Sequence, residues 1–496
     1  MRRPNLEAVG LFLLVAYAVL GAATLTGSHG WGDDWAQYVL HARNIVTGAP
    51  YGDTGYLFNP EAPYVGPPEY PPGLPLLLAP VIAVLGVDIV ALKAVCFLCF
   101  IVMLPIAYAV LARSFGKGAA FSAVVLFALH EQVWTLRQEI GSEAPYMLFS
   151  MLALLFASRN GTGPAGSGPA RTGAVVAILT YASIACRSIG IALVPALLLD
   201  AWVRRKPLSW YAAFFACLAL LLAVQRSLLV APPTYSGELT APGIDLIVGN
   251  LKGYWEVARW VVPMPLGFLS DVALAALIAV AVLGAWRVSV SGFSGASGRS
   301  LRARVACVPL PVWYLLAYLF ALALASISPG PRYFYPVLPI VLALAAVGVG
   351  HLARAVSRAR TFAFALASVL AVYYAYLHVP PRVWREDQVA TCVDCRALYA
   401  FVQAQTPPGS TIAFAKPRAL ALLGERQGWI WNPDYKAEVF RARLEQARVR
   451  FLITVAPGAQ LQERYPAYVD SAFQDGIGTT VFRNAMFRVI ELRDEL

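Results

Sequence analysis

The sequence has 496 residues, of which 59% are hydrophobic and 14% charged, and its mean hydropathy is +0.62. A water-soluble protein needs more polar residues to cover its surface, so this composition excludes a soluble globule, a disordered chain and a small disulfide-rich scaffold. The net charge of +11 lies mainly in the hydrophobic part, since residues 379–496 hold 15 basic and 13 acidic side chains. The sequence therefore predicts a membrane protein, without the basic, aromatic-rich groove that binds nucleic acid.

Eleven apolar stretches are expected to cross the membrane, because a helical span needs about 20 residues. They lie at residues 6–26, 88–112, 118–134, 143–158, 172–186, 188–203, 207–230, 266–286, 305–326, 334–350 and 361–378. The first stretch is longer than the core of about 7–15 residues of a cleaved signal peptide, so we expect a retained anchor. Pro72–Gly86 is apolar but short, and we expect a half-inserted or interfacial helix.

Basic residues gather in alternate loops. These loops hold Arg2, Arg3, Arg113, Lys117, Arg159, Arg171, Arg204, Arg205, Lys206, Arg287, Arg299, Arg302, Arg304, Arg354, Arg358 and Arg360. The other loops hold Asp33, Asp34, Asp53, Glu61, Glu69, Glu139, Glu143, Glu238, Asp245 and Glu256. The positive-inside rule puts the basic loops in the cytoplasm of a multi-pass protein of the cytoplasmic (inner) membrane. The acidic loops and the C-terminus are then extracytoplasmic.

Two domains are expected: residues 1–378, with a first outer loop at 27–87, and a soluble extracytoplasmic α/β domain at 379–496. Within the second, strands are expected at Thr411–Ala415, Gly428–Trp431, Arg450–Val455, Thr479–Arg483 and Phe487–Leu492. Helices are expected at Asp394–Gln405, Pro417–Arg426, Lys436–Ala447 and Leu461–Phe473. In the first domain, the Gly/Ser-rich segments Asn160–Ala170 and Ser289–Ser300 are expected to be flexible linkers.

Cys392 and Cys395 form a C-x-x-C motif at the start of the second domain. Three interpretations stay open: a short structural disulfide, two free thiols, or half of a metal site. The other five cysteines lie in apolar spans, where a thiol is usually a small buried hydrophobic group.

The first outer loop holds two adjacent carboxylates, Asp33 and Asp34. Asp34 is placed to cap an amphipathic helix at the membrane surface, whose apolar face would carry Trp35, Tyr38, Val39, Ala42 and Val46. Burial and like charge raise the pKa of such carboxylates, which suits a general base. The alternative is a surface helix with solvated acids.

Several short motifs follow one another along the chain: Asp33-Asp34, Tyr38 with Ala42-Arg43-Asn44, Tyr70-Pro71-Pro72-Gly73-Leu74-Pro75, Gly141-Ser142-Glu143-Ala144-Pro145-Tyr146, Cys186-Arg187-Ser188-Ile189-Gly190 and Arg332-Tyr333-Phe334-Tyr335-Pro336. Their order resembles the GT-C class of integral-membrane glycosyltransferases, which includes the lipid A aminoarabinose transferase and the protein O-mannosyltransferases. The resemblance implies a polytopic α-helical fold of the GT-C type with a C-terminal α/β domain.

The resemblance also implies a hexosyl- or pentosyltransferase that moves a sugar, with inversion, from a polyprenyl-phosphate donor. The acceptor is a hydroxyl of an envelope glycan, lipid or protein. By this resemblance Asp34 is the catalytic base, with Asp33 as second candidate. The lipid A transferases carry a lysine beside the Pro-Pro turn, where this chain has Glu69-Tyr70. Some relatives hold a divalent cation near the acidic loop, and Asp33, Asp34 and Glu69 could do so, so the sequence leaves a divalent cation possible but not assigned.

The leaving lipid phosphate needs cations in a low-dielectric site, and arginine suits this role. Arg187 and Arg332 lie at expected outer ends of spans; each could instead be a snorkelling surface residue. Glu143 could orient the acceptor, pair with an arginine or cap a helix. The other candidate substrate-binding residues are Tyr38, Glu69, Tyr70 and Tyr333.

Two other functions stay open. A transporter or flippase of lipid-linked saccharides would place charges within broken helices, whereas the acids here lie in outer loops. A receptor or scaffold would bind a partner through residues 380–496.

Overall fold

The computed structural model describes residues 6–62, 65–158, 168–228, 244–259, 267–293, 305–325, 330–355, 390–456, 461, 469 and 471–493. The predicted span at 361–378 and most of Asn160–Ala170 and of Leu461–Phe473 lie outside these residues. The segment Ser289–Ser300 is described only to Phe293, and this part continues a helix, so the prediction of a flexible linker is wrong for these residues. The rest of the segment lies outside the described residues.

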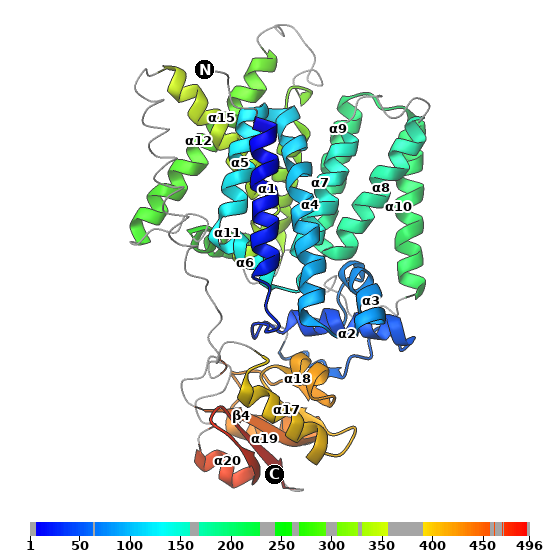
Figure 1. Cartoon of the computed structure of the whole chain (residues 1–496), viewed down its shortest axis with the longest axis vertical. Coiled ribbons are helices and arrows are strands. Elements are labelled where there is room, and N and C mark those ends of the chain that lie inside the picture. The colour runs from blue at the N-terminus through cyan, green and yellow to red at the C-terminus, as the bar shows by residue number, and fades with distance from the viewer. Residues whose placement is uncertain are drawn as a thin grey trace.

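Apolar helices pack side by side in the larger part of the molecule (Figure 1). They are α1 (Leu6–Ala23), α4 (Ile89–Phe115), α5 (Lys117–Leu129), α7 (Glu143–Ala157), α8 (Pro169–Cys186), α9 (Leu193–Val203), α10 (Leu208–Leu228), α12 (Gly267–Phe293), α14 (Leu310–Leu324) and α15 (Leu338–Ala355). The first ten predicted spans each coincide with a helix in this set, which we call the helical bundle.

Only some of these helices have the full length of a span. Within the described ranges, α4, α8, α10 and the part of α12 from Phe268 to Val290 are long and apolar enough to cross a membrane. A fifth candidate joins α5 to α6 (Glu131–Thr135) and the 3-10 turn η2 (Leu136–Gln138), with a bend of 60°. The molecule is a membrane protein, and the number of eleven crossings stays a prediction.

Two short helices lie between the helical bundle and the smaller part of the molecule (Figure 1): α2 (Asp34–Thr47) and α3 (Gly73–Leu85). The short helix expected at Pro72–Gly86 is therefore present. The start of α3 packs tightly on the end of α8, because a Cβ atom at Gly73 would lie 2.6 Å from the carbonyl carbon of Ala185. One further helix, α11 (Ile244–Ala258), was not predicted from the sequence.

The start of α2 differs from the prediction. The helix begins at Asp34, and Asp33 occupies the N-cap position without a capping hydrogen bond from its side chain. The prediction that Asp34 is the cap is wrong, because both carboxylates bind groups outside the helix. The helix also has no exposed polar face of the expected kind: Gln37 and His41 are fully buried, whereas Val46 is 40% exposed.

The smaller part, residues 390–493 as far as they are described, contains α17 (Val393–Gln405), α18 (Pro417–Leu423), α19 (Ala437–Gln446) and α20 (Ser471–Ile477). Its strands are β2 (Thr411–Ala413), β3 (Gln427–Trp429), β4 (Val449–Val455), β5 (Gly478–Arg483) and β6 (Phe487–Leu492). All five predicted strands form, with bounds that differ by up to two residues. We call this part the α/β unit.

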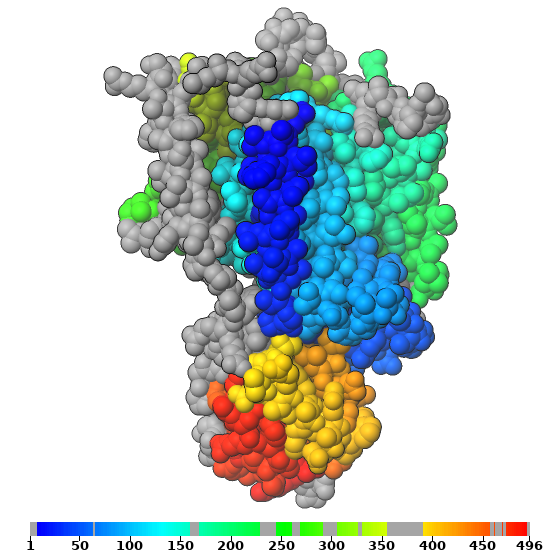
Figure 2. All heavy atoms as spheres, viewed as in Figure 1, coloured from blue at the N-terminus to red at the C-terminus, as the bar shows by residue number. Residues whose placement is uncertain are grey.

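The sheet of the α/β unit also takes a strand from the first outer loop, β1 (Tyr56–Leu57). Its order is β1-β3-β2-β4-β6-β5, with parallel pairs from β1 to β4 and antiparallel pairs at β4–β6 and β6–β5. Tyr56 pairs with Gly428 and Leu57 with Trp429. A single hydrophobic cluster joins α2 and α3 to the α/β unit through side chains such as Trp35, Leu74, Leu398 and Phe414. The segment that carries α2, β1 and α3 is therefore packed on the α/β unit, and in Figure 2 its blue spheres lie against the yellow and orange spheres of that unit.

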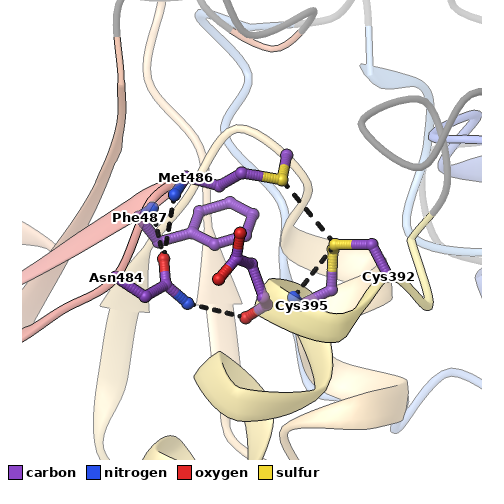
Figure 3. Close-up of a disulfide and its surroundings, with 6 residues drawn as sticks. Cys392, Cys395, Asn484, Met486 and Phe487 are labelled. Atoms are coloured by element: carbon purple, nitrogen blue, oxygen red, sulfur yellow. Dashed lines mark hydrogen bonds between the residues drawn. A yellow bond between two sulfur atoms is a disulfide. The ribbon is translucent and has the colours of Figure 1, made fainter.

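Cys392 and Cys395 form a disulfide at the start of α17, which decides among the three interpretations of the C-x-x-C motif. Figure 3 shows its neighbours: Met486 Sδ lies 3.7 Å from Cys392 Sγ, and Asn484 donates a hydrogen bond to the carbonyl of Asp394 at 2.9 Å. The disulfide closes the start of α17, and these non-covalent contacts place it beside the turn between β5 and β6.

Candidate active site

The carboxylate of Asp34, in the first turn of α2, binds three side chains from distant parts of the sequence. Its Oδ2 accepts a hydrogen bond from Arg332 Nη1 at 2.9 Å. Its Oδ1 accepts from Tyr70 Oη at 2.7 Å and lies 3.3 Å from Arg418 Nη1. We call these four residues the Asp34 cluster. A carboxylate held from three sides has a defined position and orientation.

A second ion pair lies beside it and is more buried. Glu143, the first residue of α7, accepts a hydrogen bond from Arg187 Nη1 at 2.6 Å, and their side chains are 8% and 14% exposed. Arg187 stands between the end of α8 and the 3-10 turn η3 (Ser188–Ala192). Of the three roles predicted for Glu143, the structure therefore shows the ion pair with an arginine.

Arg332 connects the two ion pairs. It lies in the 3-10 turn η6 (Pro331–Tyr333), and its Nε is 3.9 Å from Glu143 Oε1. The guanidinium carbons of Arg187 and Arg332 lie 5.2 Å and 5.6 Å from the centre of the Tyr333 ring, within the range of a cation–π contact. Four residues predicted from separate motifs, Asp34, Glu143, Arg187 and Arg332, thus meet at one place, with Tyr333 beside them.

Tyr38 lies one turn along α2 from Asp34 and reaches the second pair. Its hydroxyl donates a hydrogen bond to Ser142 Oγ at 3.0 Å, and Arg187 Nη1 donates to the same oxygen at 3.2 Å. Its ring packs on that of Tyr70, with centroids 4.9 Å apart. Tyr38 and Ser142 therefore connect α2 to the Glu143–Arg187 pair.

Asp33 binds backbone groups of the α/β unit and not the side chains of the Asp34 cluster. Its two oxygens accept hydrogen bonds from the backbone N–H groups of Arg418 and Ala419, at 3.2 Å and 3.0 Å. Both donors are in the first turn of α18, where N–H groups have no partner within the helix. Asp33 thus binds the start of a helix from the α/β unit, which favours Asp34 over Asp33 as the reactive carboxylate.

Glu69 stands near these residues without joining them. Its carboxylate packs against Gly52, and within the described residues it makes no hydrogen bond to the Asp34 cluster. Partial burial raises the pKa of this carboxyl above its usual value. Of the predicted Glu69-Tyr70 pair, only Tyr70 reaches Asp34.

The pKa of Asp34 moves opposite to the prediction. Burial raises it, but the guanidinium groups of Arg332 and Arg418 and the Tyr70 hydroxyl outweigh burial and hold it well below its usual value. The expectation that desolvation raises the pKa of both aspartates is wrong for Asp34, because two cations lie beside it. For Asp33 the expectation holds: burial raises its pKa against the opposing effect of Arg418 and Lys416.

Glu139 is a further titratable group near the site. Burial, together with the negative charge of Glu143, raises its pKa to about 7. Its carboxylate lies 3.6 Å from Nε2 of His29, which accepts a hydrogen bond from the N–H of Ile140. Burial lowers the pKa of His29 to about 3, so this histidine is neutral.

The residues named for a divalent cation do not fit one. Asp34 is bound by two guanidinium groups, whose positive charge repels a metal ion, and Asp33 is bound by backbone N–H groups. In the described ranges, no group of three or more His, Cys, Asp or Glu side chains is arranged to hold a metal.

Arg418 belongs to the site although no sequence pattern predicted it. This side chain is fully buried (0% exposed) and reaches Asp34 from α18 in the α/β unit. It is one of 15 basic residues after position 378. No local pattern distinguishes it from the others, since its partners are more than 300 residues away in the sequence.

Comparisons with known proteins bear on this arrangement. A family described as dolichyl-phosphate-mannose-protein mannosyltransferase matches residues 69–226, which is less than half of the chain. The comparison with curated protein sequences finds no significant match.

Two solved structures are similar along nearly the whole chain. ArnT from Cupriavidus metallidurans, bound to undecaprenyl phosphate, is 14% identical and has a TM-score of 0.52, with 97% of each chain covered. The oligosaccharyltransferase AglB from Archaeoglobus fulgidus, in complex with an inhibitory peptide and a dolichol-phosphate, is 13% identical. Its TM-score is 0.57, with 99% of this chain and 75% of that chain covered. The protein has the GT-C fold. The resemblance to GT-C glycosyltransferases drawn from the sequence motifs is thereby confirmed.

Another structure of the Archaeoglobus fulgidus oligosaccharyltransferase is tethered to an acceptor peptide with the NVT sequon. It is 12% identical, has a TM-score of 0.54 and covers 95% of this chain and 72% of that chain. These GT-C structures therefore include complexes with lipid phosphates and with peptides.

Proposed function

We propose that this GT-C protein is a glycosyltransferase that moves a sugar from a polyprenyl-phosphate donor to an acceptor hydroxyl at the outer face of the membrane. The observation that carries the proposal is the 2.9 Å contact between Asp34 and Arg332 beside the Glu143–Arg187 pair. It brings a candidate base and two candidate phosphate-binding cations together at the end of the helical bundle nearest α2. The lipid phosphates bound by ArnT and AglB support the donor class.

In the proposed reaction, Asp34 takes the proton from the acceptor hydroxyl as its oxygen attacks the anomeric carbon of the sugar. The bond between that carbon and the phosphate oxygen breaks on the opposite face, so the configuration inverts. The lipid phosphate leaves with the bonding electron pair. Arg332 binds its charge, and arginine suits this role because its planar guanidinium can donate two parallel hydrogen bonds to phosphate oxygens.

The exposure of the two ion pairs supports this division of roles. Arg332 is 47% exposed and Asp34 36% exposed, so a donor phosphate can reach Arg332. When the phosphate draws Arg332 away, Asp34 loses one of its two neighbouring cations. Its pKa then rises, which makes it a stronger base at the moment when the acceptor must lose its proton.

The orientation in the membrane is part of the proposal. The α4–α5 and α9–α10 connections lie at the end of the bundle opposite α2 (Figure 1). Arg113 is in the last turn of α4 and Lys117 is the first residue of α5, while Arg204 and Lys206 lie between α9 and α10. By the positive-inside rule that end faces the cytoplasm. Asp34 and the α/β unit then face the extracytoplasmic side. Labelling that finds positions 33 and 34 accessible from the cytosol would contradict this orientation.

The test is transfer by the purified protein. It is incubated with labelled polyprenyl-phosphate sugars and cell-envelope extract, and the glycosylated product is identified. We expect wild-type protein and the exposed-loop control Asp53→Asn to form product, and Asp34→Asn to be folded and at least about 100-fold slower. Full turnover by both Asp34→Asn and Asp33→Asn would show that the base is assigned wrongly.

A further inference from the structure

Arg418 is a buried cation whose place in the fold calls for an explanation. It is the second residue of α18, is 0% exposed and is among the largest fully buried side chains of the molecule. A buried charge is costly unless it is paired and hydrogen-bonded. The partners of Arg418 therefore indicate what the residue does.

These partners all belong to the first outer loop. Arg418 Nη1 lies 3.3 Å from Asp34 Oδ1 and donates to Tyr70 Oη at 2.6 Å, while Nη2 donates to the carbonyl of Pro67 at 2.9 Å. Its guanidinium carbon lies 4.7 Å from the ring centres of both Tyr56 and Tyr70. One guanidinium thus connects Asp34, Tyr70 and the loop backbone.

The backbone at the same place binds the other aspartate. The N–H groups of Arg418 and Ala419 donate to Asp33, so the first turn of α18 holds both carboxylates of the acidic pair. Nearby, β1 of the loop pairs with β3, and the N–H of Gly428 donates to the carbonyl of Gly55 at 2.8 Å. The loop that carries Asp34 is therefore attached to the α/β unit at several points.

The two arginines at Asp34 differ in their freedom to move. Arg332 is 47% exposed and lies in a 3-10 turn, so it can exchange Asp34 for a phosphate. Arg418 is enclosed by two tyrosine rings and a backbone carbonyl, so it cannot reach a donor. When Arg332 binds phosphate, Arg418 and Tyr70 remain on the same carboxylate oxygen of Asp34.

We propose that Arg418 is a positioning residue from the α/β unit, which holds Asp34 in its reactive orientation and keeps it ionised without touching the donor. The inference rests on the proposed role of Asp34 as the base. It makes the α/β unit a component of the catalytic centre, which must stay docked on the first outer loop throughout the reaction.

The charged and titratable groups around Asp34 come from five places in the chain. They are Tyr38 on α2, Tyr70 in the first outer loop, Glu139 and Glu143 before and at the start of α7, Arg332 in η6 and Arg418 in α18. The two arginines lower the pKa of Asp34. Removal of Arg418 leaves Arg332 as the only cation of this set, and donor binding then withdraws Arg332 as well.

The experiment compares Arg418→Met, Arg418→Lys and the control Arg443→Met in the full-length protein. Arg443 is in the α/β unit and pairs with Glu61 of the same outer loop, but it is 38% exposed and remote from Asp34 in its contacts. Arg443→Met therefore removes another attachment of the unit without removing a cation from the base. Arg418→Lys keeps the charge and loses the planar fork.

Three quantities are measured. The first is the pKa of the Asp34 carboxyl, from infrared spectra of protein labelled with carbon-13 aspartate, with Asp34→Asn as the reference. The second is the affinity for undecaprenyl phosphate in nanodiscs. The third is kcat and KM for donor as a function of pH.

We expect Arg418→Met to raise the pKa of Asp34 by about one to three, the usual effect of an opposite charge at this distance. The acid limb of the kcat profile should move to higher pH by a similar amount, and kcat should fall on the order of 100-fold. The affinity for undecaprenyl phosphate and KM for donor should stay as in wild type. Arg443→Met should leave all of these quantities unchanged.

If Arg418→Met does not fold, Arg418→Lys is used to test the proposal. The acid limb should stay close to that of wild type, while kcat falls, because an ammonium group cannot make the same three contacts at once. A fall in undecaprenyl phosphate affinity with kcat unchanged would overturn the proposal. Equal losses of kcat in Arg418→Met and Arg443→Met, without a change in the pKa of Asp34, would also overturn it.

Failure of the proposed function gives a different result from failure of the inference about Arg418. If wild-type protein transfers no sugar from any polyprenyl-phosphate donor, that function fails. The infrared titration still reports whether Arg418 controls the ionisation of Asp34. An Asp34 pKa unchanged in Arg418→Met would overturn the inference even if wild-type protein is an active transferase.

Discussion

The two ion pairs of the candidate active site contain the same chemical groups in different surroundings. The Asp34–Arg332 pair is 36% and 47% exposed, whereas the Glu143–Arg187 pair is 8% and 14% exposed. An exposed pair gains little from its mutual attraction and can exchange partners, while a buried pair that loses one member leaves an uncompensated charge. This difference suggests that Asp34–Arg332 opens for substrates and that Glu143–Arg187 holds the site together.

The strongest test of the comparison is the removal of the negative charge at Asp34. We expect Asp34→Asn to lower turnover by about 10²- to 10⁴-fold, the range for loss of a general base, because an amide cannot accept the acceptor's proton. The unfolding temperature should fall less than in a buried-pair variant, because the buried Arg418 keeps its hydrogen bonds to Tyr70 and to the carbonyl of Pro67. Product formation is measured with labelled polyprenyl-phosphate sugars, and Asp53→Asn in the same loop is the control. A stability loss as large as that of a buried-pair variant would contradict the comparison.

Breaking the buried pair should instead affect the fold. Arg187→Met leaves Glu143 buried and without its nearest cation, which typically costs about 3 to 5 kcal/mol. We expect a clear fall in the unfolding temperature in detergent. The double variant Arg187→Met with Glu143→Gln should recover much of the loss, since the unpaired charge is then gone. No recovery would show that Arg187 stabilises through its contact with Tyr333 or Ser142.

Loss of the exposed cation should weaken donor binding with little effect on stability. Arg332→Met removes one charged hydrogen bond to the phosphate, worth about 1.5 to 3 kcal/mol, which corresponds to about a 10- to 100-fold weaker Kd. The measurement is binding of undecaprenyl phosphate in nanodiscs. Arg137→Met serves as control, because Arg137 Nη1 donates to the carbonyl of Trp134 at 2.7 Å and to none of the residues of the Asp34 cluster. Equal affinities in the two variants would argue against Arg332 as the phosphate ligand.

The smallest effect concerns Glu139, whose pKa is raised to about 7. An acid with a raised pKa in the folded state stabilises the fold below its unfolded pKa of about 4.3, and this contribution is lost as pH rises through 7. We expect the unfolding temperature to fall modestly between pH 5 and pH 8. Glu139→Gln should flatten this dependence, and an unchanged slope would mean that another group is responsible.

Much of the fold could be predicted from local patterns. Apolar stretches of roughly span length located the helices of the bundle, and alternating strand and helix patterns located β2 to β6 with α17, α18 and α19. The helix at Gly73–Leu85 was expected from its short apolar run. The limits of local patterns appear at β1, because a strand of two residues carries no periodicity. Its strand character depends on pairing with β3.

The candidate site was predicted unevenly. Asp34, Glu143, Arg187 and Arg332 belong to motifs that resemble the GT-C class, and the structure brings all four together. The sequence predicted a raised pKa for Asp34, whereas its pKa is lowered. The prediction failed because the neighbouring sequence shows Asp33 but not Arg332 and Arg418, which lie far away in the chain. Arg418 was missed for the same reason.

The sequence by itself determined that this is a membrane protein with a polar C-terminal segment and an acidic segment after its first apolar stretch, because hydropathy and periodicity are properties of neighbouring residues. Only the tertiary structure decided which charges pair. Asp34 meets Arg332 across 298 positions and Arg418 across 384, and contacts at such separations leave no local pattern. Electrostatic interactions depend on distance in space. The pKa of Asp34 therefore depends on the tertiary structure, which brings Arg332 of the helical bundle and Arg418 of the α/β unit to its carboxylate.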